Sequence, residues 1–329
     1  MSTPVGSGSQ QINQEDAVQR VAQARQLLMQ EVHKIIIGQE EMIEQMLICI
    51  FAKGHCLTIG VPGLAKTLTV STLSQALAMK FTRIQFTPDL MPGDITGGYI
   101  FDHQENIFVL RKGPLFTHIL LADEINRASP KTQSALLEAM QERAITAAGQ
   151  RYKLDKPFFV LATQNPIEQE GTYPLPEAQL DRFMFSVWLD YPKFEDELII
   201  VKNTTSTLEI ELNPVISGKE IIYYQDLIRK IPINDNVLKY AVNLAAKTRP
   251  GNGMAADISD QYLKWGAGPR ASQYLVLGAK THAALHGKYS PDIEDVQAVS
   301  SSILRHRIIK NYKAEAENIS VDEIIEKLL

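Results

Sequence analysis

Two glycines, a lysine and a threonine are closely spaced in residues 60–67, which read GVPGLAKT. Gly60 and Gly63 permit a tight turn whose backbone N–H groups point at one anion, and the positive end of a following helix strengthens that attraction. Lys66 can reach terminal phosphates, and the hydroxyl of Thr67 can ligate Mg²⁺. The stretch therefore predicts a triphosphate-binding loop, formed by Gly60, Val61, Pro62, Gly63, Leu64, Ala65, Lys66, Thr67 and Leu68.

Ala65 departs from the usual pattern, in which a glycine precedes the lysine. Alanine has the smallest side chain with a Cβ and tolerates the first turn of a helix, so we expect the loop to keep its shape. The alternative is a strand–turn–helix corner that needs its glycines for geometry alone. A second motif decides between the two.

Two carboxylates, Asp123 and Glu124, follow the apolar run 118–122. Ligands of parallel sheets lie outside the carboxyl ends of the strands, so a strand beside the one that precedes the loop would bring both acids to the phosphates. Asp123 would then hold Mg²⁺, and Glu124 would activate the attacking water. Asn165 follows another apolar run, 158–162, and would bind the terminal phosphate or the water. Taken singly, acids at a strand end and an Asn-Pro pair are common structural features.

The elements that must position these residues alternate along the chain. Short apolar runs at 56–59, 83–86, 118–122 and 158–162 are separated by helical patterns, one of which begins at Ser129 and Pro130. This order predicts an α/β fold with a parallel sheet covered on both faces. Residues 97–112 and 144–155 interrupt it as inserted β-hairpins.

Strand patterns cease after about residue 192, and five helical segments follow, at 196–205, 224–229, 234–248, 272–285 and 293–309. We therefore expect a disordered leader over 1–14, an α/β core over 15–192, and a smaller all-helical domain over 193–329.

The composition, with 45% hydrophobic and 22% charged residues, is that of an ordinary globular protein, and the net charge of −5 gives no global attraction to nucleic acid. Neither a signal peptide nor an apolar run of about 20 residues is found, which favours a cytoplasmic protein without a membrane span. Cys49 and Cys56 lack zinc-ligand spacing and predict buried free thiols. His282 and His286, four residues apart, have no HExxH frame or carboxylate partner and predict no metal site.

Two arginines remain as candidates for catalysis. Arg182 follows Asp181, and Arg270 opens a helix in the second domain. An arginine inserted beside a reacting phosphate stabilises developing charge and raises the rate by about 10³–10⁵. The alternative for each is solvation, or pairing with a carboxylate such as Asp181.

Five motifs, GVPGLAKT, LLADEINRA, LATQNP, LPEAQLDRF and GPRAS, occur in this order and resemble the MoxR-type AAA+ ATPases over residues 20–310. The resemblance implies a P-loop core with a helical lid. It implies that Lys66 and Thr67 belong to Walker A, Asp123 and Glu124 to Walker B, and Asn165 to sensor 1. Arg182 would be an arginine finger for a neighbouring subunit, and Arg270 would be sensor 2. Gly38 and Gln39 would lie near adenine, and the two hairpins would be the helix-2 and pre-sensor inserts.

The same resemblance implies ATP hydrolysis with Mg²⁺, a homo-oligomeric and typically hexameric ring, and a chaperone-like remodelling or maturation of client proteins, often with a von Willebrand factor A domain. A nucleic-acid motor is a second possibility, because the hairpins carry Arg111, Lys112, Arg151 and Lys153. Acids are interspersed among them, however, so nucleic acid is not the expected partner. A slow nucleotide-gated regulator is a third.

Overall fold

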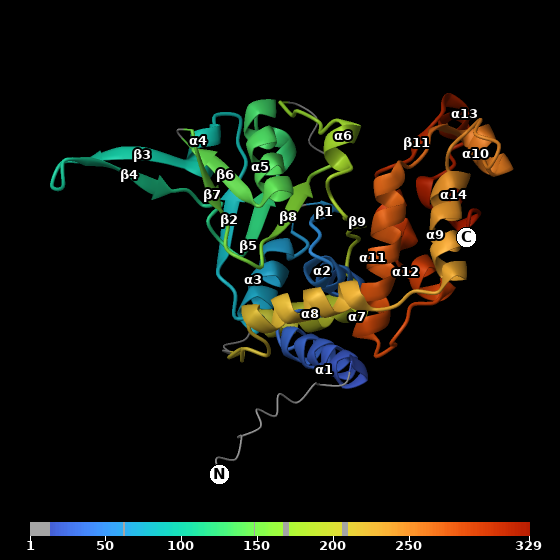
Figure 1. Ribbon diagram of the computed structural model, residues 1–329, viewed down its shortest axis with the longest axis horizontal. Coiled ribbons are helices and arrows are strands. Elements are labelled where there is room, and N and C mark those ends of the chain that lie inside the picture. Colours follow the sequence, from blue (N-terminus) through green and yellow to red (C-terminus); the bar gives the residue numbers. More distant parts are fainter. Residues whose placement is uncertain (1–13, 62, 148, 167–170, 206–209) are drawn as a thin grey trace, which may run out of the picture.

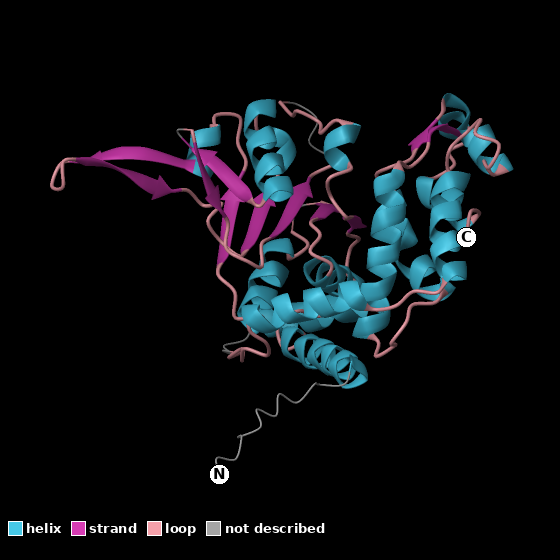
Figure 2. Cartoon of the chain, viewed as in Figure 1, coloured by secondary structure: helices cyan, strands magenta, loops and turns pink. Residues whose placement is uncertain are grey.

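A computed structural model describes residues 14–329 except 62, 148, 167–170 and 206–209. Residues 1–13 of the expected leader, and Pro62 of the loop, lie outside this set. The chain forms a sheet with helices on both faces and a group of helices beside it (Figures 1 and 2).

The central sheet has five parallel strands in the order β2-β5-β8-β1-β9, which confirms the predicted class. The strands are β1 (Cys56–Ile59), β2 (Phe81–Gln85), β5 (Ile119–Asp123), β8 (Phe159–Gln164) and β9 (Phe185–Trp188). Strand β9 was not predicted. The expectation that the carboxylates follow a strand beside β1 is wrong, because β8 lies between β1 and β5. After β1 the chain crosses to the edge of the sheet, and the later strands fill the space between.

The helices α1 (Gln14–Val32), α2 (Glu40–Phe51), α3 (Lys66–Ala76) and α5 (Pro130–Glu142) cover the sheet, with the short elements α4 (Pro92–Thr96), η1 (Ile125–Arg127) and α6 (Glu177–Leu180) around it. Strand β5 shows why both faces must be covered. Ile119 and Leu121 join the apolar cluster that contains α2 and α3, whereas Leu120 and Ala122 join the cluster that contains α5. Successive side chains of a strand point to opposite faces, so an uninterrupted apolar strand requires two layers of helices.

Both predicted hairpins are present. Strands β3 (Gly97–Asp102) and β4 (Ile107–Lys112) pair antiparallel, as do β6 (Ala144–Ala147) and β7 (Gln150–Lys153). The β3–β4 hairpin extends far beyond the rest of the chain (Figure 1). The hydroxyls of Tyr99 and Tyr152 hydrogen-bond and so join the two hairpins.

The second part of the chain comprises the helices α7 (Phe194–Thr204), α8 (Gly218–Lys230), α9 (Asp235–Lys247), α10 (Asp257–Tyr262), α11 (Pro269–Leu285), α12 (Ile293–Leu304), α13 (Tyr312–Ala316) and α14 (Val321–Glu326). It also contains the antiparallel pair β10 (Leu263–Trp265) and β11 (Ile309–Lys310), so the expectation of an all-helical domain needs correction. These strands are two and three residues long, too short to show an alternating pattern in the sequence.

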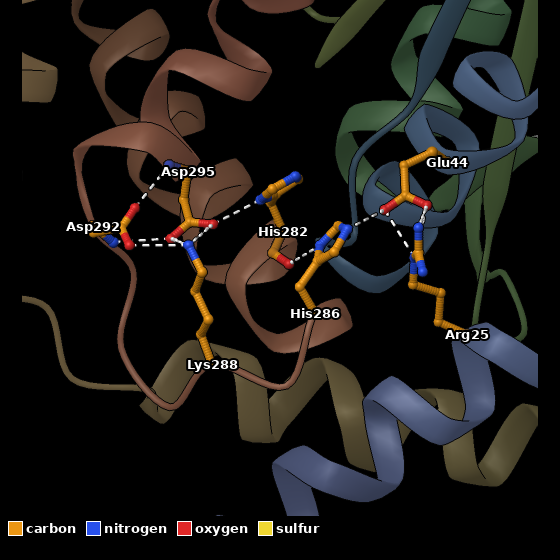
Figure 3. A network of polar contacts seen from close by, with 7 residues as sticks. All are labelled: Arg25, Glu44, His282, His286, Lys288, Asp292 and Asp295. Atoms are coloured by element: carbon orange, nitrogen blue, oxygen red, sulfur yellow. Dashed lines mark hydrogen bonds and ion pairs between the residues drawn. The ribbon is translucent and has the colours of Figure 1, made fainter.

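Polar contacts attach these helices to the core. Among them is a network that crosses from α1 and α2 to α11 and α12 (Figure 3), through Arg25, Glu44, His282, His286, Lys288, Asp292 and Asp295. His282 Nδ1 lies 2.7 Å from Asp295 Oδ1, and His286 Nε2 lies 3.8 Å from Glu44 Oε1. The histidines therefore do have carboxylate partners, contrary to expectation, because folding brings in residues remote in sequence. Burial opposes ionisation of Asp295, but its hydrogen bonds with His282, Asp292 and Lys288 lower its pKa to about 2.

Cys49 and Cys56 are buried free thiols, as predicted. No helix of the described residues is both long and apolar enough to cross a membrane.

Candidate active site

The loop between β1 and α3 contains two residues with a left-handed backbone conformation. Gly63 has φ +88° and Ala65 has φ +54°, both in the left-handed region. A Cβ on Gly60 would lie 2.9 Å from Leu189 Cβ, so close packing explains this glycine and backbone conformation explains Gly63. We expected Ala65 to lie in the first turn of the helix. Instead it precedes the helix, in a left-handed conformation. The left-handed conformation costs a residue with a Cβ about 1–2 kcal/mol.

A cavity of about 410 Å³ opens where this loop meets the ends of β2, β5 and β8. The N-terminus of α3 faces it, and its positive end favours an anion. The cavity is lined by Gly63, Leu64, Ala65, Lys66, Thr67, Leu68, Arg83, Gln85, Asp123, Glu124 and Asn165. Sequence-predicted residues from three segments thus share one space, while Gly60 and Val61 do not line it.

Lys66 begins α3 and turns back over the loop. Its Nζ donates a hydrogen bond to the carbonyl oxygen of Gly60, 2.8 Å away. Burial lowers the pKa of Lys66, and the nearby carboxylates of Asp123 and Glu124 oppose that shift. The ammonium and the two acids therefore act on one another electrostatically within the same cavity.

Asp123 is held by neighbours from both adjacent strands. Thr163 Oγ1 of β8 donates to Asp123 Oδ1 at 2.6 Å, and Arg83 of β2 pairs with Asp123 Oδ2 at 2.7 Å. Thr163 Oγ1 also accepts from the backbone N–H of Glu124 at 2.9 Å. One hydroxyl therefore contacts both acidic residues.

Glu124 follows β5 in a left-handed conformation, with φ +55°. Its Oε2 accepts from Gln85 Nε2 at 2.7 Å and from Arg127 at 3.1 Å. Two donors fix the carboxylate of Glu124, but both of them bind the same oxygen, Oε2. A water activated by Glu124 would have to compete with Gln85 or use Oε1.

The oxygen donors of the cavity suit a hard cation. Asp123 supplies a carboxylate, and Thr67 lines the cavity from the first turn of α3. Mg²⁺ is commonly held by one or two carboxylates together with waters and substrate phosphates. Across the described residues no group of three or more His, Cys, Asp or Glu could hold a metal by itself.

Three predicted sites lie outside this cavity. Gly38 and Gln39 have positive φ and precede α2, and a Cβ on Gly38 would approach the Asp196 carboxylate of α7 at 3.1 Å. Arg182 and Arg270 line a separate cavity of about 150 Å³, together with Lys53, His55, Met140, Gln141, Arg143 and Tyr274. The two arginines are therefore close to each other and are not brought to the phosphate loop of their own chain.

Asp181 joins the core to α11 and to the turn after α12. Arg270 contacts its Oδ2 at 2.8 Å, and Arg307 donates to its Oδ1 at 2.8 Å. Arg307 is nearly inaccessible and also donates to the backbone oxygens of Asp181 and Phe183. Asp181 is thus paired, but with partners from the second part of the chain.

Sequence reasoning assigned no role to Arg83, Gln85, Thr163 or Arg307. The first two alternate along β2 and therefore point to one side of the sheet, a signal visible in Arg83-Ile84-Gln85. Thr163 stands two residues before Asn165, so the same alternation along a strand predicts that the two side chains point to one side of the sheet. Nothing local distinguishes Arg307.

Comparison with known proteins gives a consistent family. Residues 55–185 match the ATPase family associated with various cellular activities (AAA), and residues 255–328 match the AAA lid domain. The chain is 40% identical to Chaperone MoxR1 of Mycobacterium tuberculosis, over 91% of this chain and 79% of that protein. It is 39% identical to Uncharacterized protein YeaC of Bacillus subtilis, over 91% of each.

The fold agrees with these matches. The crystal structure of a protein from Cytophaga hutchinsonii, assigned as an ATPase, superposes with a TM-score of 0.89 at 42% identity and covers 95% of this chain and 96% of that one. The segments that match the two family models contain the phosphate loop, the paired acids and the end of the second part of the chain, from residue 255 on. The chain belongs to the MoxR family of AAA+ ATPases.

Proposed function

We propose that this chain hydrolyses ATP with Mg²⁺ and uses the energy to remodel or mature a protein client. The observation that carries the proposal is the shared cavity of about 410 Å³, in which Lys66 and Thr67 face Asp123, Glu124 and Asn165. Phosphoryl transfer needs positioning and charge stabilisation more than covalent chemistry, and this arrangement offers both.

In the proposed reaction each residue has a separate task. Lys66 and the backbone N–H groups of the loop bind the terminal phosphates, while Asn165 orients the terminal phosphate or the attacking water. Glu124 accepts the proton of that water. Thr67 and Asp123 would hold Mg²⁺, which when bound neutralises charge on the phosphate oxygens.

The arginines support an oligomer. Arg182 and Arg270 lie together in the second cavity, away from the phosphate loop of their own chain. We propose that they reach the nucleotide of a neighbouring copy, and that copies close into a ring, typically a hexamer in this family. Heterologous contacts of this kind form rings when the rotation closes.

The β3–β4 hairpin is the proposed client contact. It extends from the core, and Ile100, Phe101, Ile107 and Phe108 are exposed on it. Exposed apolar side chains gathered on one element mark an interaction surface. We propose a protein client there, in keeping with family partners that carry a von Willebrand factor A domain.

The test is Glu124→Gln, which keeps the volume of the side chain and removes the base. We expect ATP binding to persist while kcat falls about 10²–10⁴-fold, the usual contribution of a general base. Glu294→Gln, an exposed acid of α12, is the matched control and should leave hydrolysis unchanged. Hydrolysis by Glu124→Gln at the rate of the unmodified chain would reject the assignment.

The same trapped variant tests the client. We expect it to retain a protein partner in the presence of ATP and Mg²⁺ and to release it when ATP is withdrawn. Stimulation of the unmodified ATPase by single-stranded DNA, lost at high salt, would instead favour a nucleic-acid motor.

A further inference from the structure

Helix α7 carries an apolar stripe on its outer side. None of its 11 residues, all of which the structure describes, is fully buried. Asp196, Ile200 and Asn203 form the partly covered inner side. On the opposite side Phe194 is 70% exposed, Leu198 56% and Val201 53%. Their spacing of i, i+4 and i+7 is that of a helix that docks into a groove.

Acidic residues border this stripe. Glu195 and Glu197 lie in the first turn of α7 and are exposed. On a helix of 3.6 residues per turn they fall on opposite sides of Phe194 and Leu198. Helix α7 would therefore present to a partner an apolar centre that is flanked by negative charge at the N-terminal end of the helix.

A groove with the complementary character lies on the same chain. It is a cavity of about 520 Å³ between the end of α8, α9 and α11. Its apolar lining includes Leu238 and Val242 of α9, which are 40% and 46% exposed, and Val276 and Leu277 of α11. Arg229 and Lys280 stand beside them.

The groove is positively charged. Burial lowers the pKa of Lys280, and the like charge of Arg229 lowers it further. Within the described residues neither cation has a carboxylate partner in an ion pair; Lys280 Nζ contacts only the backbone oxygen of Arg229, at 3.4 Å. A helix bearing acids beside an apolar stripe would relieve that repulsion while covering the apolar lining.

We infer that helix α7 of one copy of this chain docks into the α8–α9–α11 groove of the next copy. Two different surfaces take part, so the contact is heterologous: each copy offers both its helix and its groove, and assembly can proceed beyond a dimer. This inference rests on the proposed function, since it specifies how the copies of the proposed ring meet.

The position of the groove agrees with that role. Tyr274 lines both the groove and the cavity that holds Arg182 and Arg270. A neighbouring α7 in the groove would therefore lie next to the two arginines and put them at the boundary between copies. In the copy that contributes α7, Asp196 of this helix lies against Gly38. The family resemblance places Gly38 near the adenine of the nucleotide.

The test uses one variant on each surface. Leu198→Lys places a cation on the stripe, and Val242→Glu places an acid in the groove. Both positions are exposed, so neither change disturbs the core. We expect each variant, with Mg²⁺ and a non-hydrolysable ATP analogue, to associate at least tenfold more weakly than the unmodified chain in light scattering. Leu27→Lys, at a leucine 53% exposed on α1, is the matched control and should assemble normally.

Mixing the two variants gives the decisive result. Leu198→Lys keeps an intact groove and Val242→Glu keeps an intact helix, so an equimolar mixture has one unaltered contact and should form at least a heterodimer. In the second contact the introduced lysine meets the introduced glutamate, so larger assemblies of the mixture also agree with the inference. A mixture that stays monomeric, or variants that assemble like the unmodified chain, would overturn the inference while leaving the proposed ATPase ring intact.

Two further outcomes distinguish the remaining possibilities. If the unmodified chain stays monomeric with the nucleotide analogue, both this contact and the proposed ring are rejected. If the variants assemble normally but no longer retain the client in the ATP-trapped state, the surfaces bind the client and the inference is wrong.

Discussion

Thr163 contacts both acidic residues of the candidate site, and Thr163→Val tests how far their arrangement depends on that contact. The side chain is 1% exposed, and its hydroxyl donates to Asp123 Oδ1 and accepts from the N–H of Glu124. Valine keeps the shape and the β-branched character suited to β8. The substitution therefore removes the hydroxyl and changes little else.

The magnitude follows from the two lost hydrogen bonds. A hydrogen bond to a charged group contributes about 1.5–3 kcal/mol, and a buried N–H left without a partner costs about 1–3 kcal/mol. Asp123 and Glu124 border the cavity, where water replaces part of this loss, so we expect about 2–4 kcal/mol of destabilisation. Arg83 would still hold Asp123, and Gln85 and Arg127 would still hold Glu124, but each acidic residue would lose one contact. We expect kcat to fall about 10²-fold, because displacement of catalytic groups by an ångström has effects of that size.

Steady-state phosphate release and urea unfolding measure the two effects. KM for ATP should change little, since the phosphate loop follows β1 and makes no contact through this hydroxyl. Thr163→Ser is the control: it keeps the hydroxyl and loses one methyl group, at a cost of about 1 kcal/mol. If kcat of the valine variant stays within about threefold of that of the serine variant, Thr163 does not position the acids.

Three further changes have expected outcomes. Lys66→Ala should weaken ATP binding at least tenfold in calorimetry, because it removes an ammonium from the cavity in which we propose that the phosphates bind; unchanged affinity would contradict the phosphate assignment. Arg182→Ala should bind ATP normally but lose about 10³-fold in kcat, and its equal mixture with the unmodified chain should fall below the average of the two. If the kcat of the mixture equals the average of the two proteins, Arg182 acts on the nucleotide of its own chain. Burial lowers the pKa of His55 to about 4, although its hydrogen bond to Met140 opposes the shift. Below about pH 6.5 the unfolded chain therefore binds the proton that the folded chain excludes, and stability should fall by roughly 3 kcal/mol by pH 4. Urea unfolding at pH 7 and pH 5 would show this, and His55→Gln should reduce the difference.

Local features of the sequence were enough to identify the family and to predict which residues line the candidate site. The glycine turn lies between a strand and a helix by adjacency alone, so residues 63–68 could be assigned without knowing the rest of the fold. Asp123, Glu124 and Asn165 could be assigned because parallel strands end at one edge of a sheet. That argument does not depend on which strand lies between β1 and β5. The wrong expectation about the neighbour of β1 therefore left the predicted set of cavity residues unchanged.

Contacts between distant segments were decided only by the tertiary structure. Arg83 and Gln85 reach the acids because β2 pairs with β5, and the sequence order of the strands does not reveal that pairing. Arg270 pairs with Asp181, and His282 with Asp295, through the packing of helices whose sequences show only which side is apolar. The outer stripe of α7 is the clearest case. Its periodicity is that of a buried helix, and only the packing of the surrounding helices shows that Phe194, Leu198 and Val201 face solvent. Hydrophobic periodicity fixes which residues share a side, but the free energy of the whole packed chain decides what that side meets.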